Sequence, residues 1–526
     1  MINNLNYLRA QLEKNYMKLF NGEKTPKLII IILALISVSI HLLVINNLEY
    51  HRDELLYFSL GEHPAFGFAT VPPMIGWLAW LLQNTFGHGL FAVRILPALM
   101  SGVMIWLITL IARDLGGSNY ARIFSAIGFM IAGFSLRTFS LFMPVFLDVF
   151  FWTLVIFLLV RYVNSGKEKY LLYFGIAAGF SMLNKYLIGV LFAGLLVIVP
   201  FTRYRNVFAK KMFWLGIAAG LLICFPNIIW QIMNKLPVVN HMAELKRTQL
   251  VNVDRITFLA EQMMMGGFAS VLTIAGLFFI LLNRKGIKYR FLGILVIFVI
   301  VVLMLLRGKS YYTIGLFPFL IAAGAVAFDN NLKRTLSRIL LPVMLVVLTI
   351  PGIPMGLPIY KSDGLVRYFH TLETKYGIII ARRFEDNTVH SLPQDYADML
   401  GWEELTSITD KAYRMIGDKK ASFIYCENYG QAGAITIIGK KYGLPEAVSF
   451  NESFRYWIPL KFDPDITSFV YINGKLGKDV QMLFNKITLV GKISNPDARE
   501  YGTSVYLCEN PNSSFNVFWT NRLKRL

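Results

Sequence analysis

Residues 28–54 read LIIIILALISVSIHLLVINNLEYHRDE and join a long apolar run to a short charged segment. The apolar part, residues 28–48, has about the 20 residues that an α-helix needs to span a bilayer. Because no small-residue cleavage site follows it, we expect the run to stay in place as a membrane anchor, and not to be removed as a signal peptide. Asp53 and Glu54 come directly after the run, so the sequence predicts an acidic pair at a membrane surface.

Apolar runs of this kind recur along the chain, in which 55% of the 526 residues are hydrophobic. They predict a polytopic α-helical membrane protein with about 11 spans. The predicted spans are residues 28–48, 91–113, 119–138, 144–163, 170–186, 187–202, 212–233, 262–282, 291–306, 311–328 and 338–354.

The formal net charge of +20 raises the question of a nucleic-acid partner. The basic residues, however, punctuate the apolar runs and concentrate in alternate loops, beginning with Arg9, Lys14 and Lys18. By the positive-inside rule this pattern predicts a cytoplasmic N-terminus and, with an odd number of spans, an external C-terminus. The basic excess therefore indicates membrane topology, and we expect the lipid bilayer and no nucleic acid as a partner.

Two stretches are predicted to lie outside the membrane. Residues 49–90 are too apolar for an ordinary loop, and PPMIGWLAWLLQNTFG, from Pro72 to Gly87, has the pattern of a helix lying in the membrane interface. We therefore assign residues 1–354, with this loop, to a transmembrane domain. Residues 355–526 show strand-length apolar runs and Gly-containing turns, which predict a soluble α/β domain on the extracytoplasmic side.

Ionisable and tyrosine side chains gather at the predicted outer ends of the spans. Ionisable groups at a membrane are costly unless they are paired or functional, so each of them is a site hypothesis. The candidate site residues are Asp53, Asp148, Glu54, Arg94, Arg137, Lys309, Tyr311, Tyr312, His51 and His241. A carboxylate can act as a general base on a hydroxyl group and cations can hold a phosphate, so this set suits transfer from a lipid phosphate.

The two adjacent acids are predicted to have different roles. On a helix Asp53 and Glu54 diverge by about 100°, so only one of them can face a reacting atom. We expect Asp53 to be the base, with a helix cap as its alternative. Glu54 is kept as a further catalytic candidate, but a structural role in a solvated turn is favoured for it. His51, His63 and Glu49 lack the spacing of metal ligands, so no metal site is predicted.

The other candidates also have structural alternatives. Asp148 could cap its span, where an acid suits the positive end of the helix dipole. Arg94 and Arg137 could extend to lipid headgroups. Lys185, between the fifth and sixth predicted spans, either reaches the outer site or anchors the chain at the interface, and we favour the anchor. His241 lies on a predicted outer loop.

Several motifs occur together in an order that is typical of one enzyme family. They are the acidic pair after the first span, Pro72 and Pro73, VRILPALMSG at the second span, MPVFLDVFFW at the fourth, LNKY after the fifth and GKSYYTIGLFPFL near the tenth. Over residues 28–330 the chain thus resembles the bacterial family 39 glycosyltransferases. These belong to the GT-C superfamily of polyprenyl-phosphate-dependent transferases, which includes protein O-mannosyltransferases and lipid A aminoarabinose transferases.

The resemblance implies an inverting transfer of a sugar from a polyprenyl monophosphate donor to an acceptor hydroxyl of a lipid, glycan or protein. The reaction would take place at the extracytoplasmic face of the plasma membrane and without a metal cofactor, because cationic side chains can stabilise a departing monophosphate. In the family pattern Asp53 matches the catalytic aspartate and Asp148 a second acidic position. Arg94 and the Lys309 region match basic positions near the lipid phosphate.

The chain departs from the family at one place. Aminoarabinose transferases carry a lysine immediately before the first proline, and many relatives have Asp-His there, whereas this chain has Thr70 and Val71. Either Lys309 or Arg137 supplies the missing phosphate contact, or the donor binds differently.

Two functions outside the transferase class are the alternatives. A transporter or flippase for a lipid-linked sugar would place ionisable groups near the bilayer midplane and show a pseudo-repeat, whereas the charges here gather at one face. A catalytically inactive scaffold does not account for the retained Asp53, Asp148 and Lys309.

Two features of the C-terminal domain leave alternatives open. Cys426 and Cys508 lie in the similar contexts FIYCEN and VYLCEN, so they either form a disulfide or are two strand-end thiols. The segment NYGQAGAI, residues 428–435, is interpreted as a turn and helix that build the fold, with acceptor recognition as the alternative.

Overall fold

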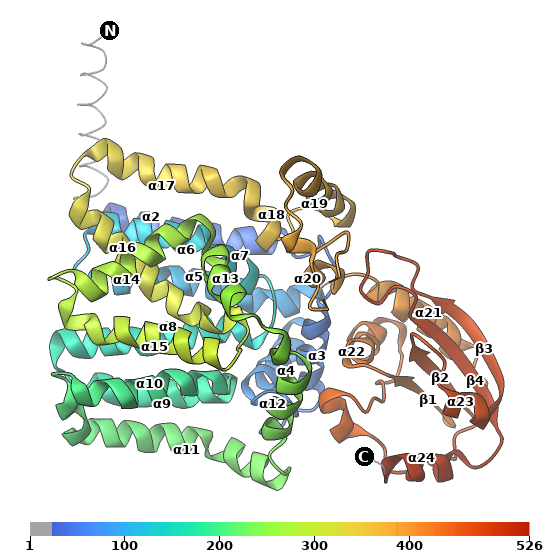
Figure 1. Cartoon of the computed structure of the whole chain (residues 1–526). Coiled ribbons are helices and arrows are strands. Elements are labelled where there is room, and N and C mark those ends of the chain that lie inside the picture. The colour runs from blue at the N-terminus through green and yellow to red at the C-terminus, as the bar shows by residue number, and fades with distance from the viewer. Residues whose placement is uncertain (1–23, 387, 525–526) are drawn as a thin grey trace. The chain divides into compact units, whose positions relative to one another are not determined.

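The computed structural model of the chain describes residues 24–386 and 388–524 (Figure 1). The basic residues Arg9, Lys14 and Lys18, which contribute to the predicted topology, lie outside the described residues. The chain forms two compact units. One contains Arg94–Leu357 and the segment that ends at Leu43, and the other contains Val44–Val93 and Pro358–Leu526.

The first unit is helical, and Figure 1 shows its long helices lying side by side. Its α-helices are α2 (Lys24–Leu43), α5 (Leu90–Asp114, which begins in the second unit), α6 (Asn119–Ile131), α7 (Gly133–Thr138), α8 (Pro144–Ser165), α9 (Lys169–Asn184), α10 (Gly189–Ile198), α11 (Lys211–Met233), α12 (Pro237–Thr248), α13 (Arg255–Gly266), α14 (Ser270–Leu282), α15 (Arg290–Leu305), α16 (Phe317–Asn331), α17 (Thr335–Thr349) and α18 (Ile353–Gly356).

Eight helical segments within the described residues are long and apolar enough to cross a membrane. They are Lys24–Leu43, Leu90–Asp114, Pro144–Ser165, Lys211–Met233, Arg255–Leu282, Ile287–Leu305, Ser310–Asn331 and Thr335–Gly356. The predicted polytopic helical fold is confirmed, but the count of about 11 spans is not.

The remaining predicted spans are shorter in the structure because the backbone leaves the helical conformation. Residues 119–138 are divided between α6 and α7 at Ala132, which has φ −66° and ψ 130°. Residues 170–202 form α9, of 16 residues, and the shorter apolar segment Tyr186–Phe201, with extended Lys185 between them (φ −158°, ψ 127°).

Pairs of glycines allow neighbouring helices of this unit to approach closely. Gly175 and Gly179 of α9 face Gly216 and Gly220 of α11, and a Cβ added at Gly175 would lie 2.2 Å from the carbonyl carbon of Gly216. Small residues at a four-residue spacing are typical of helix contacts in membranes, where packing replaces the hydrophobic effect.

The second unit combines the first loop with the C-terminal α/β region. Its elements are α3 (Arg52–Ser59), α4 (Met74–Phe86), α19 (Ser362–Tyr376), α20 (Gln394–Ala397), α21 (Trp402–Arg414), β1 (Ser422–Cys426), α22 (Tyr429–Ile437), β2 (Ser468–Asn473), α23 (Lys478–Leu483), β3 (Phe484–Lys492), β4 (Ser504–Pro511) and α24 (Phe515–Leu523), with short 3₁₀ turns between several of them.

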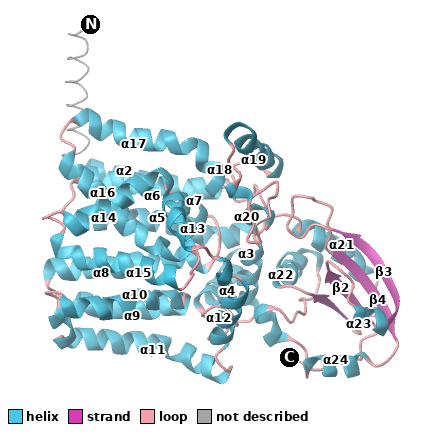
Figure 2. Ribbon diagram, viewed as in Figure 1, coloured by secondary structure: helices cyan, strands magenta, loops and turns pink. Residues whose placement is uncertain are grey.

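The C-terminal region contains a four-stranded sheet with the order β1-β2-β4-β3 (Figure 2). β1 and β2 are parallel, and the other two pairs are antiparallel. Alternate residues of the strands, such as Phe423, Phe469 and Tyr471, build a core with Phe515 and Trp519 of α24. The predicted α/β class of this region is therefore confirmed.

Two further predictions for this unit are met. The helix predicted within residues 72–87 is α4, Met74–Phe86. Cys426 in β1 and Cys508 in β4 are free thiols with β2 between their strands, so the disulfide alternative is excluded. The predicted division after residue 354 concerns membrane topology and stays a prediction, whereas by packing Val44–Val93 groups with the C-terminal region.

Candidate active site

The acidic pair lies in the first turn of α3, where His51 is the N-cap. The His51 ring nitrogen Nδ1 accepts a hydrogen bond from the Asp53 N–H at 3.0 Å. The Glu54 carboxylate accepts one from the His51 N–H at 2.9 Å, which completes a capping box. Glu54 is fully buried and His51 is 3% exposed. Glu54 therefore has a structural role, but as a buried member of the capping box and not in a solvated turn. The N-cap residue is His51 and not Asp53, and Asp53 is the acid with a different partner.

That partner is Tyr429, the first residue of α22. The Tyr429 hydroxyl donates a hydrogen bond to Oδ1 of Asp53 at 2.8 Å. Burial raises the pKa of Tyr429 well above its usual value, and the charge of Asp53 adds to this effect. The phenol therefore keeps its proton and acts as a donor to the carboxylate. The segment NYGQAGAI begins a helix, as predicted, but its contact with Asp53 was not foreseen.

Arg52 lies on the other side of the Tyr429 ring. The centre of its guanidinium group is 4.6 Å from the ring centroid, and its Nη2 atom is 4.0 Å from Oε1 of Glu500. Burial alone would lower the pKa of Arg52, but the negative charges of Glu500 and Asp398 oppose this effect, and the pKa lies above its ordinary value. Arg52 is therefore a permanent cation beside the predicted base.

Glu452, another carboxylate of the C-terminal region, also acts on this group of residues. Burial raises the pKa of Glu452, and the negative charge of Asp53 adds to the increase, while a hydrogen bond with the Thr70 side chain opposes it. Its φ of 51° is unusual for a residue other than glycine. Thr70, at the position where the sequence departs from the family, is thus engaged with Glu452. Nothing in the sequence around Glu452 predicted this.

In the helical unit, Asp148 forms the centre of a second group. It is 3% exposed, and its Oδ1 atom accepts a hydrogen bond from Nε1 of Trp152 at 3.0 Å. Nζ of Lys185 lies 3.8 Å from the other carboxylate oxygen. Asp148 is therefore a buried acid that is compensated by a cation and an indole donor.

Lys185 also contacts the tyrosines that follow Lys309. Its Nζ atom is 5.2 Å from the ring centroid of Tyr311 and 4.9 Å from that of Tyr312. Lys309 is close enough for its charge to act on Lys185. The structure thus brings four predicted residues together around Lys185, and it favours the site alternative for Lys185 over the interface anchor. The extended backbone at Lys185, which ends α9, directs this side chain.

The remaining candidates lie on three other helices. Arg94 is on α5 and is 3% exposed, and Arg137 is on α7. His241 lies on α12, where the sequence predicted a loop. Their roles in substrate binding stay predictions.

Within residues 24–386 and 388–524, no three His, Cys, Asp or Glu side chains gather in a way that could hold a metal ion. Metal independence stays an expectation.

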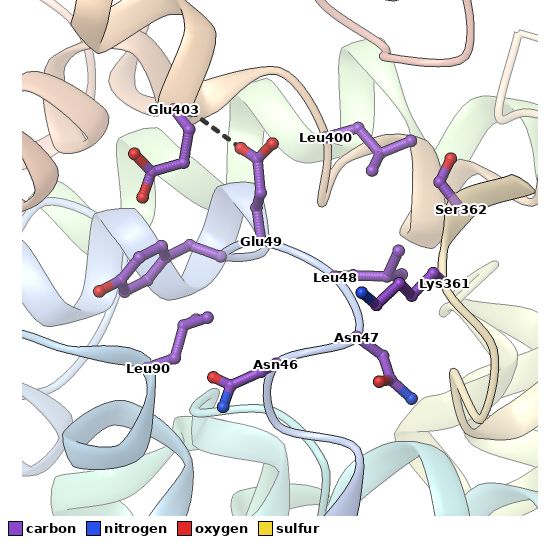
Figure 3. A pocket seen from close by; sticks show the side chains of 10 residues that line it. Asn46, Asn47, Leu48, Glu49, Leu90, Lys361, Ser362, Leu400 and Glu403 are labelled. Carbon is purple, nitrogen blue, oxygen red and sulfur yellow. Dashed lines mark hydrogen bonds between the residues drawn. The ribbon is translucent and has the colours of Figure 1, made fainter.

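A cavity of about 390 Å³ lies elsewhere in the second unit (Figure 3). Its lining includes Asn46, Asn47, Glu49, Lys361 and Glu403. The Glu49 carboxylate accepts hydrogen bonds from the N–H groups of Glu403 at 2.9 Å and Gly401 at 3.3 Å. Glu49 therefore caps the start of α21, and the cavity wall is fixed by this contact.

The comparisons with known proteins agree with the resemblance seen in the sequence. Residues 70–230 match the model of the dolichyl-phosphate-mannose-protein mannosyltransferase family. No curated protein sequence matches the chain.

Solved structures share the fold. ArnT from Cupriavidus metallidurans bound to undecaprenyl phosphate is 13% identical, with a TM-score of 0.63 over 92% of this chain and 98% of that chain. Its apo state is also 13% identical, with a TM-score of 0.61 over 90% and 97% of the two chains. The arabinofuranosyltransferase AftD from Mycobacteria is 13% identical, with a TM-score of 0.50 over 94% of this chain and 41% of that chain.

The fold is similar to that of ArnT and AftD, and the match of residues 70–230 to the mannosyltransferase family model agrees with the predicted class of membrane glycosyltransferase. The predicted enzyme class is thereby confirmed. Within this class the chain is similar to the protein mannosyltransferase family over residues 70–230, and its fold is similar to that of ArnT.

Proposed function

We propose that the protein transfers a sugar from a polyprenyl monophosphate to a hydroxyl group of a lipid, glycan or protein acceptor. The match of residues 70–230 to the mannosyltransferase family carries the proposal. The undecaprenyl phosphate bound in the structurally similar ArnT supports the choice of donor. The reaction belongs to the extracytoplasmic face of the plasma membrane, with residues 355–526 on that side.

In the proposed reaction Asp53 acts as the general base. Its carboxylate takes the proton of the acceptor hydroxyl while the hydroxyl oxygen attacks the anomeric carbon of the sugar. The bond between that carbon and the phosphate oxygen breaks, and its electron pair leaves with the polyprenyl phosphate. Attack from the side opposite to the leaving group inverts the anomeric configuration.

The departing phosphate gains negative charge, and cationic side chains can stabilise it without a metal ion. Lys185 and Lys309 are the best-supported cations, because the structure groups them with Asp148 and the two tyrosines. Arg94 and Arg137 are further candidates. Asp148 holds the ammonium group of Lys185 in place.

The central test of this function is the variant Asp53→Asn in proteoliposomes. The probes are undecaprenyl-phosphate-linked hexoses and pentoses, with an envelope extract as the source of acceptors. Asparagine keeps the size of the side chain but cannot take a proton, so we expect release of undecaprenyl phosphate to fall by about 10²-fold or more. Donor binding, measured by protection against thermal unfolding, should be retained.

An Asp53→Asn variant with wild-type turnover would refute the proposal. The alternative of a lipid-linked sugar flippase gives a different result in the same vesicles. A flippase moves labelled donor across the bilayer when no acceptor is present, whereas the proposed transferase releases undecaprenyl phosphate only with an acceptor. Mass spectrometry of envelope lipids, glycans and proteins, with and without the protein, then identifies the acceptor.

A further inference from the structure

We infer that Tyr429 is a positioning residue for Asp53, so that the C-terminal α/β region forms part of the reaction centre. The inference rests on the proposed function, in which Asp53 is the base. The C-terminal α/β region would then help to orient the base, whereas the sequence suggested only acceptor recognition for this region.

The contact itself has the geometry of a strong hydrogen bond. The Tyr429 hydroxyl donates to Oδ1 of Asp53 at 2.8 Å, across 376 residues of sequence. A bond from a neutral donor to a charged acceptor is stronger than one between neutral groups. It occupies one carboxylate oxygen and fixes the side-chain torsion, so the second oxygen, Oδ2, is left to take the proton of the acceptor.

The start of α22 holds Tyr429 in a defined place. Asn428 is the N-cap and accepts a hydrogen bond from the Gln431 N–H at 3.0 Å. Glu500 accepts from the side-chain amides of Asn428 at 3.1 Å and Gln431 at 2.9 Å. Two side chains at the start of α22 are therefore bonded to Glu500, and these bonds fix the position of Tyr429 independently of α3.

Glycines of α22 bring this helix close to α3. A Cβ added at Gly430 would lie 2.8 Å from Cγ of Arg52, and one added at Gly433 would lie 2.9 Å from the backbone carbonyl of Leu55. No larger residue fits at Gly433 without a shift of the α3 backbone. The close packing of α22 on α3 at these glycines therefore brings Tyr429 within hydrogen-bond distance of Asp53.

Arg52 completes the arrangement. Its guanidinium group lies over the Tyr429 ring at 4.6 Å and near Glu500 at 4.0 Å. The ring is thereby held between a cation and the helix start, which restricts the direction in which the hydroxyl points. A residue placed in this way orients the base and does not itself touch the reacting atoms.

The test compares Tyr429→Phe with Tyr471→Phe in the full-length protein. Both changes remove a partly buried tyrosine hydroxyl that forms a hydrogen bond, and that of Tyr471 accepts one from Asn473 at 3.0 Å. We expect Tyr429→Phe to lower kcat about 10- to 100-fold, the range of one hydrogen bond to a charged group. The KM for an undecaprenyl-phosphate-linked sugar should stay within about twofold, and Tyr471→Phe should keep the wild-type kcat.

Asp53→Asn is measured beside them to separate the two claims. If Asp53→Asn is inactive but Tyr429→Phe has the wild-type kcat, the positioning role is refuted and the proposed function stands. If Asp53→Asn is fully active, the proposed function itself fails. If Tyr429→Phe loses activity only through a lower melting temperature, with kcat per folded molecule unchanged, the positioning role is also refuted.

Discussion

At the residue scale, Asp148 and Lys185 depend on each other. Asp148 is 3% exposed, and the ammonium group of Lys185 at 3.8 Å is its compensating cation. Removing one member of a buried ion pair leaves an uncompensated charge, which is more harmful than removing both. The pair therefore has a structural task in addition to its proposed one.

We predict that Lys185→Met destabilises the protein by about 3 kcal/mol or more, because the Asp148 carboxylate would stay buried without its cation. The double variant Lys185→Met/Asp148→Asn should recover most of the lost stability but no transferase activity. Melting temperatures in detergent and donor turnover provide the two measurements.

The single variant Asp148→Asn completes the double-mutant cycle. If the effects of the two single changes simply add in the double variant, the two side chains are not coupled and the pair has been misassigned.

Individual site residues were predictable to different extents. Asp53 and Asp148 follow from their places at the ends of apolar runs and from the family pattern. Tyr429 and Glu452 could not be predicted, because their partners in the first loop are several hundred residues away in the sequence. For Lys185 the sequence favoured the interface anchor, because its contacts with Asp148, Tyr311 and Tyr312 come from the tertiary structure.

At the scale of the elements, the α9–α11 contact depends on glycine. Gly175 and Gly179 meet Gly216 and Gly220 at distances that no side chain allows. α14 and α16 also pack closely at a glycine, since a Cβ at Gly324 would lie 2.0 Å from the Leu272 carbonyl oxygen. Such contacts substitute for the hydrophobic effect between helices in lipid.

We predict that Gly175→Leu separates α9 from α11 and lowers the melting temperature of the detergent-solubilised protein. Overpacking of this kind costs typically about 1 to 3 kcal/mol. Gly189→Leu is the matched control, because no heavy atom lies within 4 Å of a Cβ at Gly189. Equal melting temperatures for the two variants would contradict the proposed role of the glycine contact.

The helix ends within apolar segments were harder to predict from the sequence than the segments themselves. Hydropathy located the apolar segments and the junction at Lys185, but it did not place the break at Ala132, where the backbone turns extended without a proline. Two predicted spans correspond to α9 and the short segment Tyr186–Phe201.

At the scale of the whole molecule, the chain passes three times from one compact unit to the other. The composition change after residue 354 predicted the α/β region, and its sheet confirms that prediction. The sequence did not reveal that Val44–Val93 packs with Pro358–Leu526, because this grouping depends on contacts between helices such as α3 and α22.

We predict that a chain ending at Leu357 is inactive although it retains Asp53 and every predicted span. Without α22 the first loop loses the helix that packs on α3, so it should become sensitive to limited proteolysis. The full-length variant Gly433→Leu should reproduce the activity loss in milder form, because it forces α22 away from Leu55. Wild-type turnover by the shortened chain would show that the C-terminal region is dispensable for the reaction.

The grouping of Val44–Val93 with Pro358–Leu526 also sets an order of events during synthesis. The early segment leaves the ribosome before most of the apolar helices, and its packing partners are translated after them. Until Tyr429 has been translated and α22 has folded against α3, Asp53 lacks the hydrogen bond of this phenol. A nascent chain that ends before α22 is therefore expected to be inactive toward the donor.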